Sequence, residues 1–208
     1  MLNVIIDNQE IDLREIPLDS RVAILTGTFD PAHMGHINIG EESLQQGNAG
    51  NYGELDYFFF VPHSSSPGKA PIPLNIRILI LRALVGNSHN PKMGILFGDG
   101  VEHCSSVTNL FSILSAYIGE QNHLSYIRVI GADRIDHAVV EHLDVQHIVF
   151  SRDGSRLMAS DTPANFYVLE MDFNRGLSST LLRTGQVPFG SEYKPVMKYV
   201  REYYPNGI

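Results

Sequence analysis

The sequence predicts an α/β fold, in which a mostly parallel sheet of five to six strands carries helices on both faces. Two observations support this. Short apolar runs rich in β-branched and aromatic residues alternate along the chain with longer stretches of helical periodicity. Parallel neighbours need a crossover connection, usually a helix, so the alternation indicates right-handed βαβ units.

The first two strand and helix pairs are expected within residues 21–86. A buried strand, RVAILTG (21–27), precedes an Asp-Pro turn and a helix at 34–46, which ends in the Gly/Asn-rich segment GNAGNYG. The second strand, LDYFFFVP (55–62), ends at a proline and leads through a polar loop to an apolar helix at 76–86.

The later elements continue the alternation. We expect strands at 93–99, 124–133, 146–154 and 166–172, and helices at 107–121, 137–143, 177–185 and 194–204. The first 20 residues predict an N-terminal arm in front of one domain at 21–208, because 208 residues suit a single domain.

Composition narrows the class of protein. The chain has 15 Lys and Arg against 23 Asp and Glu, a net charge of -8, which disfavours a nucleic acid or an anionic membrane as partner. The single cysteine, Cys104, is typical of a reducing cytoplasm. The N-terminus lacks the pattern of a signal peptide, and Arg82 interrupts the most apolar run. We therefore expect a cytoplasmic protein without a membrane span, whose oligomeric state stays open.

The loop after the first predicted strand, TGTFDPAHMGH, has the features of a phosphate site. In such sheets ligands bind beyond the carboxyl ends of the strands, where the winding reverses. Gly35 lets the backbone approach a ligand, and the start of the following helix attracts an anion. His33 and His36, three residues apart, can both donate to phosphate oxygens.

Two alternatives exist for these histidines. They could bind zinc, but a further ligand is needed, for which His103 and Cys104 are the candidates. They could also be half-buried residues of an ordinary helix start. We predict phosphate contacts and no metal site.

Two motifs carry a resemblance to a known family. GTFDPAHMGH resembles the HxGH signature of the nucleotidylyltransferase superfamily, and GLSSTLLR (176–183) resembles its C-terminal ISSTxxR motif. VIGADR and SSSPGK resemble the GxD segment and the lysine loop of the same superfamily. The first histidine and the SST form are similar to nicotinate mononucleotide adenylyltransferases rather than to pantetheine-phosphate adenylyltransferases. The resemblance runs from about Arg21 to the end and implies a Rossmann-like, doubly wound parallel sheet.

The resemblance also implies an activity. Members of the family transfer AMP from ATP to the 5′-phosphate of a pyridine mononucleotide, nicotinate or possibly nicotinamide mononucleotide, and release pyrophosphate with Mg²⁺. This is a step of NAD biosynthesis. ATP and a pyridine mononucleotide are then the expected partners, and catalysis consists of positioning and charge neutralisation.

Residue roles follow from matching the motifs. His33, His36 and Arg183 are implied as catalytic residues, with His36 the stronger candidate for stabilising the reacting centre. The implied ATP-binding residues are Thr28, Phe29, Lys69, Gly131, Asp133, Arg152, Ser179 and Thr180. The implied acceptor-binding residues are Ser105, Ser106 and Thr108.

The sequence departs from the family on the acceptor side. Relatives often place a tryptophan after the GxD segment to stack on the pyridine ring, whereas this chain has no tryptophan. The segment 103–108 is rich in hydroxyls and has no acidic side chain of its own, which favours the nicotinate carboxylate. The alternatives are transfer to another phosphorylated acceptor such as phosphopantetheine, and a non-catalytic nucleotide-binding regulatory protein.

Overall fold

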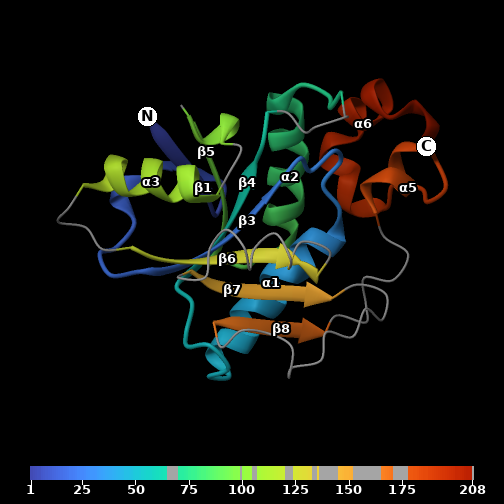
Figure 1. The fold of residues 1–208 in the computed structure, drawn as a ribbon. Helices are drawn as coiled ribbons and strands as arrows, with labels where there is room; N and C mark the ends of the chain where they lie inside the picture. Colours follow the sequence, from blue (N-terminus) through green and yellow to red (C-terminus); the bar gives the residue numbers. More distant parts are fainter. Residues whose placement is uncertain are drawn as a thin grey trace.

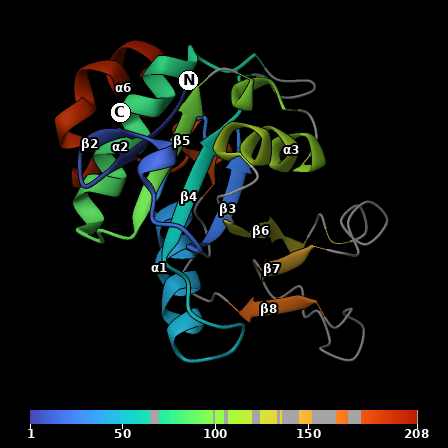
Figure 2. The ribbon, with the colours of Figure 1, turned by 90° about the vertical axis from the view of Figure 1, so that its left-hand side faces the viewer.

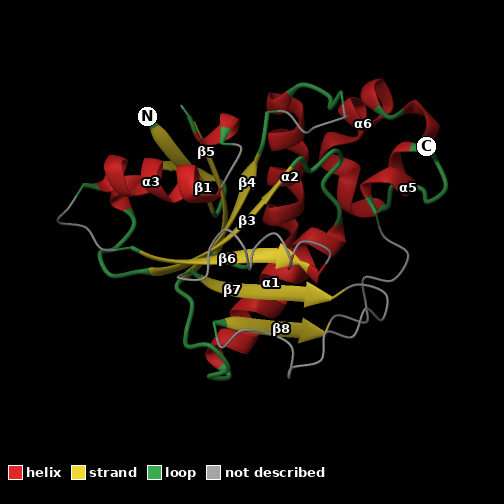
Figure 3. Ribbon diagram, in the orientation of Figure 1, coloured by secondary structure: helices red, strands yellow, loops and turns green. Residues whose placement is uncertain are grey.

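A computed structural model describes residues 1–64, 70–98, 100–104, 107–119, 124–132, 135, 145–151, 165–170 and 178–207 (Figure 1). The strands of these segments form one eight-stranded sheet in the order β2-β1-β5-β4-β3-β6-β7-β8. Helices flank this sheet on both faces (Figure 3). The predicted α/β class with a mostly parallel sheet is therefore confirmed.

All six predicted strands form and run parallel. They are β3 (Arg21–Gly27), β4 (Tyr57–Pro62), β5 (Met93–Gly98), β6 (Ser125–Gly131), β7 (Gln146–Ser151) and β8 (Phe166–Glu170). From β3 the chain first winds outward through β4 to β5, then returns to pair β6 with the other side of β3. The winding reverses between β3 and β6, so a ligand is expected at the carboxyl ends of these two strands.

The expected strand number of five to six is too low, because the N-terminal segment adds two strands. β1 (Leu2–Ile6) pairs antiparallel with β5 and with β2 (Gln9–Asp12). Asp7 and Asn8 form the two-residue turn, both with positive φ (48° and 62°), as a tight hairpin requires. The segment expected as an arm thus shares the sheet and the core with the rest of the chain.

The described helices divide between the two faces. They are α1 (Met34–Asn48), α2 (Leu74–Ser88), α3 (Val107–Ile118), α5 (Ser179–Arg183) and α6 (Met197–Tyr203), with short 3-10 turns at Leu13–Glu15, Val101–His103, Ser191–Val196 and Pro205–Gly207. Figure 2 shows α2 and α6 on one side of β4 and α3 on the other. The helix predicted at 137–143 lies outside the described residues. Within the described part, no helix is both long and apolar enough to cross a membrane.

Side chains alternate in direction along each strand, so β3 contributes residues to the cores on both faces of the sheet. Ala23 and Leu25 of β3 point into the core that α1 and α2 cover. Val22 and Ile24, the intervening residues, point into the second core, which α3 covers. β3 is therefore buried on both sides, and the loop that follows it starts from a rigid base.

Candidate active site

The loop after β3 leads directly into α1 at the point where the winding reverses. His33 is the N-cap residue of α1, so the positive end of the helix dipole lies beside the two histidines. Phe29 has φ of 49°, a conformation that a residue with a side chain adopts only when its surroundings hold it there. Its ring is buried and packs edge-on against His36, with 5.0 Å between the ring centroids. The aromatic ring thereby supports His36 from one side.

The two imidazoles lie together, and one hydrogen bond orients His36. The ring centroids of His33 and His36 are 3.9 Å apart. The backbone N–H of His33 donates to Nδ1 of His36 at 3.2 Å. Because Nδ1 accepts, a neutral His36 carries its ring proton on Nε2, which can donate to a phosphate oxygen. His36 is partly exposed whereas His33 is 3% exposed, so His36 is the better placed of the two to meet a ligand.

The second motif packs directly on this loop. Ser178 caps α5 by accepting from the backbone N–H of Leu181 at 3.2 Å. The hydroxyl of Ser179 donates to the carbonyl of Pro31 at 2.8 Å, across 148 residues of sequence. Arg183 donates through Nη1 to the carbonyl of Asp30, and Nη2 donates to the hydroxyl of Thr180 at 3.2 Å. The structure therefore brings the two predicted motifs together.

Asp30 and two tyrosines complete the support of the loop, a role that the sequence alone did not indicate for any of the three. The Asp30 carboxylate is buried, 3.6 Å from Nη1 of Arg183, and accepts from the hydroxyl of Tyr204 at 2.5 Å. Tyr193 donates to the carbonyl of Ala32 at 2.7 Å. Burial raises the pKa of both tyrosines, and the Asp30 carboxylate raises the pKa of Tyr204 further. Both hydroxyls thus stay protonated and act as donors at neutral pH.

We expect Tyr204→Phe to lower the free energy of unfolding by about 2 kcal/mol, because a buried carboxylate loses a donor. Urea denaturation measures this change. Tyr203→Phe, on the adjacent residue, is the matched control and should leave the midpoint unchanged. Equal midpoints for the two variants would show that the Asp30 bond does not stabilise the fold.

Some of the other predicted site residues lie in the described part of the chain, and the rest lie outside it. The carbonyl of Thr28 accepts from Nη1 of Arg77. Gly131 ends β6, the strand that pairs with β3, and lies opposite Phe150 of β7, at the same edge of the sheet as the histidine loop. Lys69, Asp133, Arg152, Ser105 and Ser106 lie outside the described residues. Thr108 lies in the first turn of α3, where only its backbone is described.

Metal ligands do not gather in the described ranges, where no three His, Cys, Asp or Glu side chains are arranged to hold an ion. Cys104, one of the two zinc candidates, is buried, and burial raises the pKa of its thiol. His103, the other candidate, contacts the hydroxyl of Ser64 through Nδ1 at 2.8 Å. Neither zinc candidate therefore belongs to a three-ligand cluster among the described residues.

A mostly parallel sheet wound in this order, with a helix start at the reversal point, defines a Rossmann-like α/β protein. A family model described as cytidylyltransferase-like matches residues 24–185, and the chain belongs to this family. The matched range starts within β3 and ends just after α5, so it contains both motifs of the candidate site.

Two relatives that are similar to this chain in sequence carry the same name. A relative from Listeria monocytogenes, named "Probable nicotinate-nucleotide adenylyltransferase", is 23% identical over 193 residues, which cover 88% of this chain and 95% of the relative. A relative of the same name from Geobacter sulfurreducens is 27% identical over 116 residues, 54% of this chain, and the match spans about half of the relative, 49%.

Among solved structures, the fold is similar to that of Plasmodium falciparum nicotinic acid mononucleotide adenylyltransferase complexed with NaAD. The TM-score is 0.68 at 14% identity, covering 90% of this chain and 97% of that chain. A second structure of the Plasmodium enzyme, complexed with APC, gives a TM-score of 0.67. These similarities establish a shared fold.

Proposed function

We propose that this protein is an adenylyltransferase that moves AMP from ATP to the 5′-phosphate of nicotinate mononucleotide and releases pyrophosphate. The observation that carries the proposal is the contact between the His33–His36 loop and α5 through Ser179 and Arg183. That contact gathers two imidazoles, a guanidinium and a helix start at one edge of the sheet, a set of donors suited to a polyphosphate. The names of the relatives support the same activity.

The reaction needs positioned positive charge rather than a covalent intermediate. An oxygen of the mononucleotide phosphate attacks the α-phosphorus of ATP, and the bond from that phosphorus to the pyrophosphate oxygen breaks. In our proposal Nε2 of His36 donates to an oxygen of the reacting phosphate, where charge develops in the transition state. Arg183 and Thr180 hold the outer phosphates, and Ser179 keeps α5 against the loop. His33 and the N-terminus of α1 supply the remaining proposed contacts to the phosphates.

Mg²⁺ would enter with ATP and neutralise charge on the departing pyrophosphate. In this proposal the ATP phosphates supply ligands to the ion, as is usual for Mg²⁺ that binds with a nucleotide. Lys69, Asp133 and Arg152 on the ATP side, and Ser105, Ser106 and Thr108 on the acceptor side, remain proposals from the motifs. We place the reaction in the cytoplasm because the chain has a single cysteine, which is typical of proteins in a reducing compartment.

A pyrophosphate-release assay with Mg²⁺-ATP and a panel of acceptors tests the proposal. We expect release with nicotinate mononucleotide, formation of the corresponding dinucleotide, and a higher kcat/KM for this acid than for nicotinamide mononucleotide. A charged carboxylate accepts only, so it matches the hydroxyl-rich segment 103–108 better than an amide does.

Other outcomes of the same assay contradict the proposal. A clear preference for the amide would overturn the assignment of the acceptor. Turnover with phosphopantetheine alone would move the protein to a different acceptor class. ATP binding without release for every acceptor would indicate a regulatory protein.

A further inference from the structure

Arg77 is a completely buried arginine whose hydrogen bonds all go to loop carbonyls. It lies in the first turn of α2, at 0% exposure. Nε donates to the carbonyl of Ile72 at 2.9 Å, Nη1 to those of His63 at 2.7 Å and of Thr28, and Nη2 to that of Ser64 at 3.3 Å. Within the described segments, no carboxylate lies within 4.0 Å of its guanidinium. Among the described residues these carbonyls are its hydrogen-bond partners, and the charge of the Asp30 carboxylate further favours the protonated guanidinium.

These contacts join consecutive loops at the carboxyl edge of the sheet. Thr28 directly follows β3 and opens the loop that carries the histidines, whereas His63 and Ser64 directly follow β4. One nitrogen, Nη1 of Arg77, bonds to both loops. The backbone N–H of His63 also donates to the carbonyl of Gly27 at 2.9 Å, so the two loops are held in register.

Ser64 extends the connection to a third loop. Its backbone N–H and its hydroxyl both donate to the carbonyl of Glu102 at 2.8 Å, and the hydroxyl lies 2.8 Å from Nδ1 of His103. Glu102 and His103 belong to the 3-10 turn that follows β5. A continuous series of hydrogen bonds therefore runs from the histidine loop through Arg77 and Ser64 to the start of the predicted acceptor segment.

The chemistry of this position calls for an arginine. A buried charge is costly unless its donors are satisfied, and the planar guanidinium places three nitrogens on four carbonyls at once. A lysine has one nitrogen and cannot span them. Burial, followed by the positive charge of Arg77, lowers the pKa of His63, which places this charge close to the loop after β4.

We propose that Arg77 is a positioning residue that holds the ATP side and the acceptor side of the site in fixed relation. The proposal rests on the proposed function, because the loop after β3 carries the ATP contacts and the loop after β5 leads into the acceptor segment. The phosphate oxygen of the mononucleotide must lie in line with the bond that breaks. A small displacement of one loop against the other would therefore slow the reaction.

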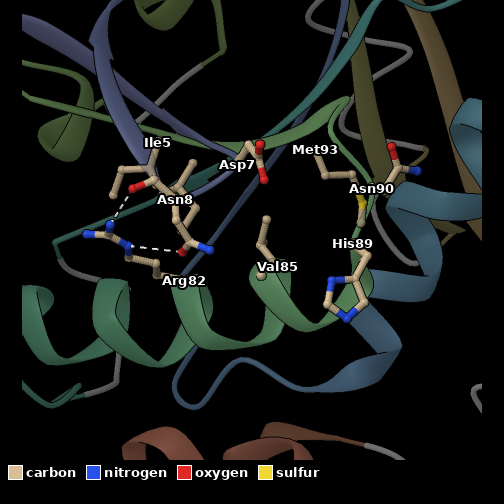
Figure 4. Close-up of a pocket in the computed structure, with 10 residues that line it drawn as sticks. Ile5, Asp7, Asn8, Arg82, Val85, His89, Asn90 and Met93 are labelled. Atoms are coloured by element: carbon tan, nitrogen blue, oxygen red, sulfur yellow. Dashed lines mark hydrogen bonds between the residues drawn. The ribbon is translucent and has the colours of Figure 1, made fainter.

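The test compares Arg77→Lys with Arg82→Lys. Arg82 lies in the same helix and also donates to a turn carbonyl, that of Asn8 at 2.6 Å. Figure 4 shows this contact in a small pocket lined by Ile5, Asp7, Val85 and His89, beside the start of β5 and therefore at the opposite edge of the sheet. Arg82→Lys thus makes the same chemical change away from the site.

We expect Arg77→Lys to lower kcat/KM for the mononucleotide by about tenfold to a hundredfold, as loss of orientation does. Arg82→Lys should stay within about twofold, since surface changes away from a site have small effects. Both are measured well below the unfolding temperature of each variant, so that loss of fold does not enter. Equal kcat/KM values for the two variants would overturn the proposal.

Amide hydrogen exchange gives a readout that does not depend on activity. The amides of His63 and Ser64 should exchange faster in Arg77→Lys and at the wild-type rate in Arg82→Lys. Absence of dinucleotide synthesis by the wild type would refute the proposed function, and the exchange rates would still decide whether Arg77 joins the loops. Unchanged exchange in Arg77→Lys would refute that role.

Ser64→Ala tests the next link if Arg77→Lys fails to fold. This variant removes the hydroxyl contacts to Glu102 and His103 and keeps the backbone bonds. We expect a raised KM for the mononucleotide and an unchanged KM for ATP. A KM for the mononucleotide equal to that of the wild type would contradict the proposed coupling.

Discussion

We expect His36→Ala to lower kcat by about a hundredfold or more, the usual cost of removing one preorganised donor to a developing charge. The structure shows why this donor is preorganised: Phe29 packs against the ring, and the N–H of His33 occupies Nδ1. The stability of the fold should change little, because the side chain is partly exposed. Steady-state kinetics of pyrophosphate release measures the effect.

His89→Asn is the matched control for this experiment. His89 is exposed at the end of α2 with φ of 53°, a conformation that asparagine tolerates. It lines the pocket beside the start of β5, away from the histidine loop, so kcat should equal that of the wild type. An unchanged kcat in His36→Ala would remove this residue from the mechanism.

Arg183→Met is expected to have the second large effect, lowering kcat/KM by about a hundredfold or more. The change removes a cation from the proposed phosphate site, and it also removes the partner of the Asp30 carbonyl and carboxylate. Arg183→Lys should be intermediate, because the charge remains but one nitrogen cannot serve both Asp30 and Thr180.

Inhibition by pyrophosphate separates the two contributions of Arg183. We expect the inhibition constant to rise in Arg183→Met and to change less in Arg183→Lys. Arg201→Met, at an exposed position of α6, serves as the control and should behave as the wild type. Equal kcat/KM values for Arg183→Met and Arg201→Met would exclude a role for Arg183.

Local pattern predicted most of the sheet, because the parallel strands are short runs rich in apolar residues, and β3, β4, β5 and β7 each bury at least four consecutive residues. The sequence pattern did not predict the N-terminal hairpin. QEID is polar, and the residues of LNVII and QEID become strands only because LNVII pairs with β5. The turn residues Asp7 and Asn8 were the one local signal of the hairpin.

The sequence predicted the site residues that belong to short motifs. It did not predict those whose role depends on contacts between distant parts of the chain. His33, His36 and Arg183 belong to recognisable motifs. Tyr204 and Arg77 do not, because their importance comes from hydroxyl and guanidinium contacts with the carboxylate of Asp30 and the carbonyl of Thr28. Such contacts depend on tertiary packing, for which the sequence around either partner gives no signal.

The contacts of the histidine loop with Tyr193 and Tyr204 limit the order in which the chain can fold during its synthesis. Their partners in the loop lie 161 and 174 residues earlier in the chain. Chains fold progressively while the ribosome synthesises them, so β3 and α1 emerge long before these tyrosines exist. In a nascent chain the histidine loop therefore emerges well before its tyrosine partners, and it can hold both hydroxyl contacts only after residue 204 has left the exit tunnel.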